Sequence, residues 1–141
     1  MELIAASRIV KAQARVQAAV PYANGITEVV RNLQGAGGGV GHPMLVERPA
    51  VARVGVIPIA ADRGLCGAYN SQVIRAAEAE LREHAKSGRA FELFTVGRKA
   101  EGYFRFRNFP IEATHAGFSD NPSYENARQI ADSVVNRYEA G

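Results

Sequence analysis

The stretch VGVIPIAADRGLCGAYN, residues 54–70, decides how this chain is expected to fold. Residues 54–60 are an apolar run with the length of one buried strand, and residues 62–70 form a glycine-bearing turn that leads into an amphipathic segment. A turn between a strand and a helix is where α/β proteins usually place their binding and catalytic groups. The stretch therefore predicts an α/β domain and nominates its own turn as a candidate site.

Strand and helix patterns alternate along the rest of the sequence. The predicted elements are strand 54–60, helix 71–87, strand 90–96, helix 97–107, strand 111–115 and helix 123–138. This β-α-β-α-β-α order predicts a parallel sheet with helices on its faces, typical of an incomplete Rossmann-like domain. Pro58 is awkward within the first strand, because proline donates no ladder hydrogen bond and prefers an edge or a bulge. The sequence stops after a helix where another strand is expected, so both of its ends look cut.

Residues 1–33 predict one long helix with an apolar seam. The seam residues recur at alternating steps of four and three: Ala5, Ile9, Ala12, Val16, Ala19, Ala23, Ile26, Val30 and Leu33. This is the spacing of a coiled coil, and its alanines would let a partner helix approach closely. Pro21 lies inside the helix and is expected to kink it. The rest of the sequence carries no second seam of this length, so we expect the partner helix to be missing or to belong to another chain.

The sequence of residues 34–52 predicts a linker, because its first half is rich in glycine and prolines stiffen its end. The expected organisation is a shaft-like helix over residues 1–33, a Gly/Pro linker over 34–52, and an incomplete α/β domain over 53–141.

Composition narrows the class of protein. The chain has 141 residues with a formal charge of +3, which is too weak alone to indicate nucleic-acid binding. Its one cysteine allows no internal disulfide and is typical of a reducing compartment. No apolar run reaches the length of a membrane helix, and Glu2 follows Met1 where a secretion signal would be basic and then apolar.

A basic stripe of Arg8, Lys11 and Arg15 follows one side of the predicted N-terminal helix. The stripe is either a solvated face or a surface that meets an acidic protein. Nucleic acid is a weaker alternative, because no aromatic residues are interleaved for base stacking.

The 62–70 turn matches no catalytic or cofactor motif. It contains Gly64 and Gly67, fewer glycines than a dinucleotide fingerprint needs, and no Lys-Ser or Lys-Thr follows as in a P-loop. Asp62 at its mouth would repel phosphate, although Arg63 offsets that charge. We therefore favour a structural role for this turn. The alternative is that the chain is a small α/β domain that binds a nucleotide through the 62–70 loop. Cys66 has no C-x-x-C partner, so a small buried cysteine is the commoner interpretation.

The three histidines, His42, His84 and His115, have no spacing typical of a metal site or a catalytic site. We accordingly expect no catalytic residue, no cofactor and no metal on this chain.

The whole sequence nevertheless resembles a known family in a series of short motifs. They are Met1 to Gln13, Arg15, Pro21-Tyr22-Ala23, His42-Pro43-Met44-Leu45, Asp62-Arg63-Gly64-Leu65-Cys66-Gly67, Val96-Gly97-Arg98-Lys99, Gly117-Phe118-Ser119-Asp120 and Tyr124-Glu125-Asn126-Ala127. In this order they resemble the gamma subunit of F-type ATP synthase, with residues 62–67 as the family's signature turn. The sequence departs from the family by lacking the extreme N-terminus and the C-terminal half, so we expect a fragment or a truncated reading frame.

The resemblance implies a mechanical role. It implies the central-stalk rotor of a proton-translocating ATP synthase, which rotates inside the ring of alpha and beta subunits and couples proton flow to ATP synthesis. Its other implied partners are the epsilon subunit and the membrane c-ring, with no nucleic acid and no membrane span of its own. The implied location is peripheral, at the cytoplasmic face of the cell membrane. Our interface hypothesis assigns Met1, Arg8, Lys11 and Arg15 to the shaft surface that meets acidic loops of the beta subunits.

Overall fold

A computed structural model describes residues 2–35, 43–46 and 48–140 of the chain. The chain divides into two compact units, residues 1–47 and 48–141. Much of the predicted 34–52 linker, including His42, and also Met1 lie outside the described residues.

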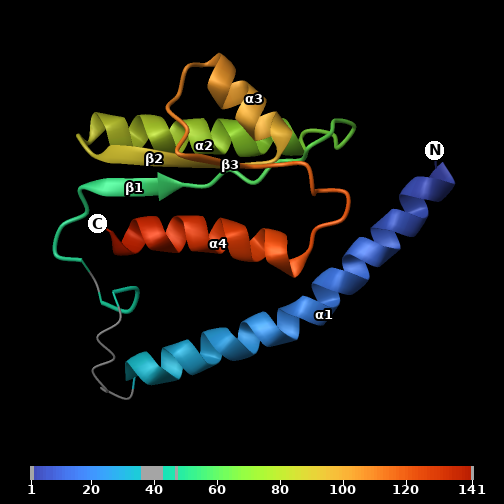
Figure 1. Cartoon of the computed structure of the whole chain (residues 1–141), viewed down its shortest axis with the longest axis horizontal. Helices are drawn as coiled ribbons and strands as arrows, with labels where there is room; N and C mark the ends of the chain where they lie inside the picture. Colours follow the sequence, from blue (N-terminus) through green and yellow to red (C-terminus); the bar gives the residue numbers. More distant parts are fainter. Residues whose placement is uncertain (1, 36–42, 47, 141) are drawn as a thin grey trace. The chain divides into compact units, whose positions relative to one another are not determined.

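The described part of the first unit contains one helix, α1, which runs from Glu2 to Gly35. It passes through Pro21 without ending, and Figure 1 shows α1 with a bend near its middle. A bend is expected there, because proline removes one i→i−4 hydrogen bond. No side chain that the structure describes in α1, residues 8–33, is buried. The seam residues Ile9, Val16, Ile26 and Leu33 are 45–61% exposed, so the apolar stripe predicted from the sequence lies open along the helix.

The second unit is built on a parallel sheet whose described strands have the order β1-β2-β3. The strands are β1 (Arg53–Val56), β2 (Ala90–Val96) and β3 (Ala113–His115). Val54 lies opposite Phe91 in the first ladder, and Phe94 lies opposite Ala113 in the second. The fold class is therefore α/β, with a three-stranded parallel sheet and an N-terminal helix.

Pro58 shortens the first strand. The sequence predicts one strand over residues 54–60, but β1 ends at Val56 and pairing resumes only as an isolated bridge at Ile59. The backbone of Val96 donates to the Pro58 carbonyl at 3.0 Å, and the Ala60 backbone donates to the Val96 carbonyl at 2.9 Å. The chain thus stays beside β2 while the residue that cannot donate interrupts the ladder.

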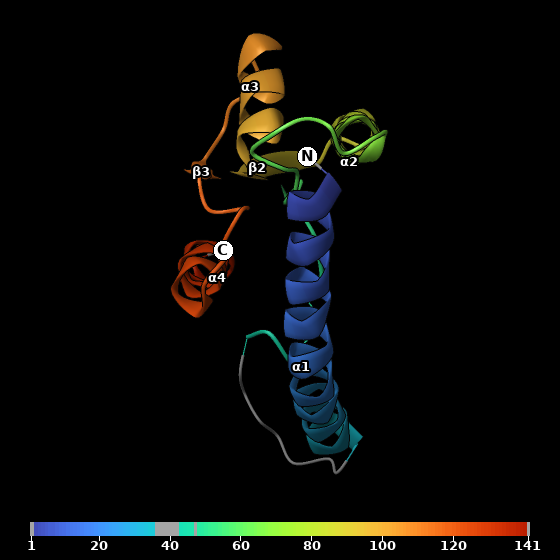
Figure 2. The ribbon, with the colours of Figure 1, turned by 90° about the vertical axis from the view of Figure 1, so that its right-hand side faces the viewer.

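Two helices cover one face of the sheet and a third lies on the other. Figure 1 and Figure 2 show α2 (Tyr69–Lys86) and α3 (Arg98–Phe106) on the same side, with α4 (Tyr124–Glu139) on the opposite side. The main core lies on the α2–α3 side and contains Ile74, Ala77, Leu81, Leu93, Ala100 and Phe104. The sequence predicts that Val73, Ile74, Ala77 and Leu81 form the apolar face of α2, and the burial of Ile74, Ala77 and Leu81 confirms that spacing.

Helix α4 packs differently from α2 and α3. Ser123 caps its first turn in a reciprocal capping box with Asn126. None of its residues, all of which the structure describes, is buried. The sequence predicts that Tyr124, Ala127, Ala131, Val134 and Tyr138 form the apolar face of this helix, but of these only Val134 is half-buried and Tyr124 is 82% exposed. The residues that are half-buried are instead Asn126, Ile130, Ser133, Val134 and Val135.

Candidate functional site

Three loops meet at the carboxyl end of the sheet, and the carboxylate of Asp62 joins them. Its Oδ1 accepts hydrogen bonds from the backbone N–H groups of Arg98 at 3.0 Å and Gly117 at 2.9 Å. Its Oδ2 accepts from the Ser119 backbone at 2.9 Å and from the Ser119 hydroxyl at 2.6 Å. The Ser119 oxygen in turn accepts from the Asp62 backbone N–H at 2.9 Å. We call this set of contacts the Asp62 bridge; it connects the loops that follow β1, β2 and β3.

The Asp62 bridge holds a negative charge. Burial alone raises the pKa of the Asp62 carboxyl, but hydrogen bonds from Ser119, Gly117 and Arg98 outweigh it and hold the pKa far below its ordinary value. The Arg98 N–H is the first of α3, so the charge also faces the positive end of that helix. The ionised side chain therefore occupies the position at which a helix N-terminus in this fold would receive a phosphate.

Gly97 lets the middle loop come close enough for the Asp62 bridge to form. Its φ is 89°, in the left-handed region that favours glycine. A Cβ at this position would lie 2.1 Å from the carbonyl oxygen of Ala60. Its N–H donates to the His115 carbonyl at 2.8 Å. A side chain at position 97 would therefore separate the loops that follow β1 and β2.

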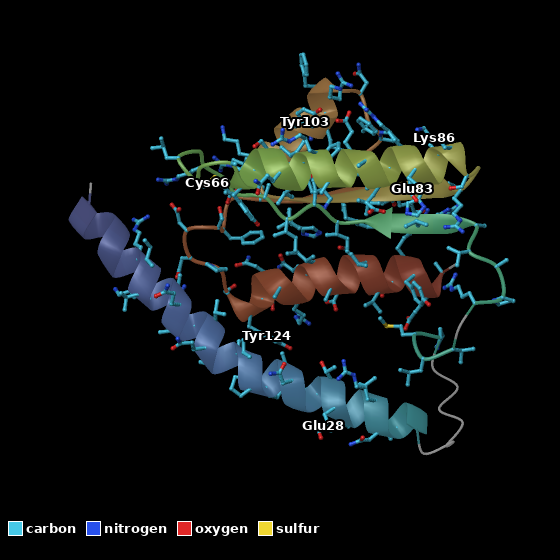
Figure 3. The ribbon with its side chains drawn as sticks, turned by 180° about the vertical axis from the view of Figure 1, so that it is seen from behind. Glu28, Cys66, Glu83, Lys86, Tyr103 and Tyr124 are labelled. Carbon is cyan, nitrogen blue, oxygen red and sulfur yellow. The ribbon has the colours of Figure 1, made fainter. Side chains whose placement is uncertain are left out.

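Asn70 closes the 62–70 turn from inside. Its Oδ1 accepts from the Ala61 backbone at 2.9 Å, while its Nδ2 donates to the Arg63 carbonyl at 3.2 Å and to Cys66 Sγ at 3.0 Å. Cys66 is half-buried rather than fully buried as predicted, because its sulfur lies at the edge of the turn beside the Asn70 amide. Figure 3 labels Cys66 at the start of α2.

The tip of the turn is exposed and conformationally costly. Leu65 has a φ of 63° and is 97% exposed, and Gly67 also has a positive φ of 58°. Arg63 forms an ion pair with Asp120 at 2.9 Å, and both side chains are substantially exposed. The turn is thus held at its base by Asn70 and the Asp62 bridge.

The chemistry available at this edge is limited. A small cavity of about 70 Å³ is lined by Asp62, Arg63, Arg98, Gly117 and Asp120. Its two carboxylates oppose its two guanidinium groups, and the backbone donors that would hold a phosphate already bind Asp62. Among the residues that the structure describes, no cluster of His, Cys, Asp and Glu could hold a metal ion. The geometry therefore supports a structural turn and gives no support to the nucleotide-binding alternative.

The other candidate residues lie elsewhere in the two units. Arg8, Lys11 and Arg15 are exposed on α1. His115 ends β3, and its Nε2 lies 3.0 Å from the Ser133 hydroxyl of α4. His84 lies on α2, with its Nε2 3.5 Å from Glu80.

The sequence patterns assign no role at this site to five of its residues: Asn70, Gly97, Arg98, Gly117 and Ser119. The last four follow the ends of predicted parallel strands. Because such strand ends share one edge of a sheet, that placement is the signal that could have found them.

Comparisons with known proteins agree over the whole chain. Residues 1–141 match the family model described as ATP synthase. The chain is 52% identical over 140 residues to the ATP synthase gamma chain of Mycolicibacterium smegmatis, covering 99% of this chain and 45% of that protein. It is 46% identical over 140 residues to the ATP synthase gamma chain of Mycobacterium tuberculosis strain H37Rv, covering 99% of this chain and 46% of that protein. The chain thus spans about half the length of these curated relatives.

A solved structure resembles the fold as well. It describes the central stalk and c-ring of the mitochondrial ATP synthase of Tetrahymena thermophila. The matching chain is 25% identical with a TM-score of 0.69, and the alignment covers 97% of this chain and 58% of that one.

Proposed function

We propose that this chain, which belongs to the ATP synthase gamma family, forms part of the central rotor of a proton-translocating F-type ATP synthase. The observation that carries the proposal is the combination of a family match over all 141 residues with a long helix whose apolar seam lies open. In this role the chain couples proton flow to ATP synthesis by rotating inside a ring of alpha and beta subunits. The nucleotide chemistry then belongs to the ring, and we assign no catalytic residue here.

The helix α1 would supply one strand of the shaft, as a coiled coil. Its alternating seam and its small residues Ala12, Ala19 and Ala23 suit close packing against a second long helix. Ile9, Val16, Ile26 and Leu33 are each about half exposed, so burying what remains would contribute roughly 1 kcal/mol per residue. The seam would thereby stabilise an assembled shaft.

The α/β unit would supply the foot of the rotor, and we propose a Rossmann-like arrangement for it. Parallel strands in consecutive order, with helices on both faces, support this assignment. The proposed organisation keeps the shaft at residues 1–33, the linker at 34–52 and the foot at 53–141. The epsilon subunit and the membrane c-ring are the proposed partners of the foot.

The signature turn, residues 62–67, would keep the foot stiff rather than bind a ligand. Its Asp62 bridge connects loops separated by as many as 57 residues in the sequence. A domain that transmits torque requires such cross-links, because its strands and helices must move together.

The basic stripe on α1 would face acidic loops of the beta subunits, together with Met1. Exposed pairs contribute only about 0–1 kcal/mol each, so losing one should weaken coupling without preventing assembly. None of the described helices is long and apolar enough to cross a membrane. We propose a peripheral place at the cytoplasmic face of the cell membrane, through the complex.

A chimera tests this function. Residues 1–141 would replace the matching part of the M. smegmatis gamma chain, and ATP-driven proton pumping would be measured in inverted vesicles. We expect the chimeric complex to assemble and pump. Arg8→Ala, Lys11→Ala and Arg15→Ala together should reduce pumping more than the control Arg31→Ala, which changes an exposed arginine outside the stripe. Unchanged pumping in the triple variant would show that the basic stripe does not have the proposed role. An assembled chimera that hydrolyses ATP without pumping protons would contradict the rotor proposal itself.

A further inference from the structure

We propose that α4 is a releasable strap, which detaches from the sheet while β1, β2, α2 and α3 stay folded, and that Arg53, Glu92 and Arg137 control its attachment. We call these three residues the Glu92 clamp. The proposal concerns the dynamics of the α/β unit and does not depend on the rotor function.

The first observation is the contrast in burial between the two faces of the sheet. Leu81 of α2 and Phe104 of α3 are almost completely buried in the main core, whereas α4 buries no residue fully. Figure 3 labels Tyr124 at the exposed start of α4. A helix that buries no residue fully is held by less apolar burial than α2 or α3, so it can open while they remain folded.

The second observation is that directed polar contacts attach the last turns of α4. Arg137 donates to both carboxylate oxygens of Glu92 on β2, with its shortest contacts at 2.6 and 2.8 Å. Arg53 of β1 donates to the same carboxylate at 2.9 Å. The Glu92 side chain is 12% exposed and that of Arg137 is 42% exposed, so the pair is only partly screened by water.

Further polar contacts attach α4, beside its half-buried apolar residues Ile130, Val134 and Val135. Its middle meets β3 through the contact between His115 Nε2 and the Ser133 hydroxyl at 3.0 Å. Near its end, the Arg48 guanidinium donates to the Tyr138 carbonyl and lies 4.2 Å from the centre of the Tyr138 ring. Release of the helix would break these contacts and expose its half-buried apolar side chains, but it would leave the main core closed.

Release would uncover a specific part of the sheet. Phe94 and Val96 share the face of Glu92 because side chains alternate along a strand, and neither belongs to the main core cluster. They are 3% and 4% exposed in the attached state. The strap therefore covers an apolar surface that becomes accessible when the Glu92 clamp opens.

Hydrogen exchange of the 141-residue chain, followed by mass spectrometry at peptide resolution, tests the proposal. Glu92→Gln keeps the size of the side chain but removes its charge. We expect amide exchange in residues 124–139 to rise by about tenfold or more, the change that corresponds to one lost charge-assisted hydrogen bond. Exchange in residues 69–86 should stay unchanged. In the wild type, raising NaCl to about 1 M should also speed exchange in α4 selectively, since the screening length then falls to about 3 Å.

The control is Glu125→Gln, which removes an exposed ion pair formed with Arg128 inside α4 itself. It should change exchange in α4 far less than Glu92→Gln does. If α4 and α2 exchange at equal rates relative to their unstructured references, or if Glu92→Gln speeds both helices equally, α4 belongs to the global folding unit and the proposal is wrong. Should Glu92→Gln fail to fold, Arg137→Gln makes the same test from the helix side, and its failure to fold as well would also overturn the proposal.

Discussion

Replacing Asp62 with alanine should destabilise the α/β unit severely. The change removes the acceptor of three backbone N–H groups, those of Arg98, Gly117 and Ser119, and of the Ser119 hydroxyl. Hydrogen bonds to a charged group contribute about 1.5–3 kcal/mol each. Asp62 is only half-buried, so water would replace part of this set. We therefore expect a total loss of roughly 2–4 kcal/mol.

The assay is urea unfolding at pH 7, followed by circular dichroism, and the quantity compared is the free energy of unfolding. Asp120→Ala is the matched control, because it removes a neighbouring aspartate whose ion pair with Arg63 is exposed. The control should cost about 1 kcal/mol or less. Asp62→Asn should cost nearly as much as the alanine variant, since its amide group would place a donor against a donor. A loss at Asp62→Ala no larger than at Asp120→Ala would refute the bridging role.

Three further outcomes are expected. Gly97→Ala should cost more than about 3 kcal/mol, or abolish folding, because its Cβ would lie 2.1 Å from the Ala60 oxygen; an unfolding free energy within about 1 kcal/mol of wild type would contradict this. The advantage of the wild type over Asp62→Asn should be complete above about pH 5 and shrink as the pH falls below about 4, because folding lowers the pKa of Asp62; urea titrations from pH 7 to 2.5 check the sign, and an advantage that grows in acid would contradict it. Calorimetry with ATP, ADP and NAD should give no saturable heat, because Asp62 occupies the phosphate position; binding abolished by Arg98→Ala would instead support a nucleotide site.

Local patterns in the sequence predicted most of the elements of the α/β unit. The strand at residues 90–96 was predicted with its observed bounds, and the apolar spacing of α2 placed Ile74, Ala77 and Leu81 in the core. These features depend on periodicity within a few turns or on the two-residue alternation of a strand. The sequence marks Pro58 as awkward within a strand, but it does not show that the ladder ends there, since that depends on how β2 passes beside it.

The contacts of the candidate site depend on long-range geometry. Asp62 meets residues 36 to 57 positions further along the chain, and no local pattern specifies which donor its carboxylate will find. The half-buried face of α4 differs from the predicted one for a related reason. Its line of tyrosines and alanines has helical spacing, but Ile130 and Ser133 are half-buried instead, and contacts of Ser133 and Arg137 attach the helix to the sheet. Polar contacts of this kind produce no hydrophobic periodicity in the sequence.

The most direct test of the central claim is rotation. In a complex that carries the chimeric M. smegmatis gamma chain, a probe would be attached to the segment derived from residues 53–141, with the ring of alpha and beta subunits fixed to a surface. We expect ATP addition to drive continuous rotation of the probe in one direction, and an inhibitor of hydrolysis to stop it. A complex that hydrolyses ATP at a normal rate while the probe stays still would contradict the assignment of this chain to the rotor.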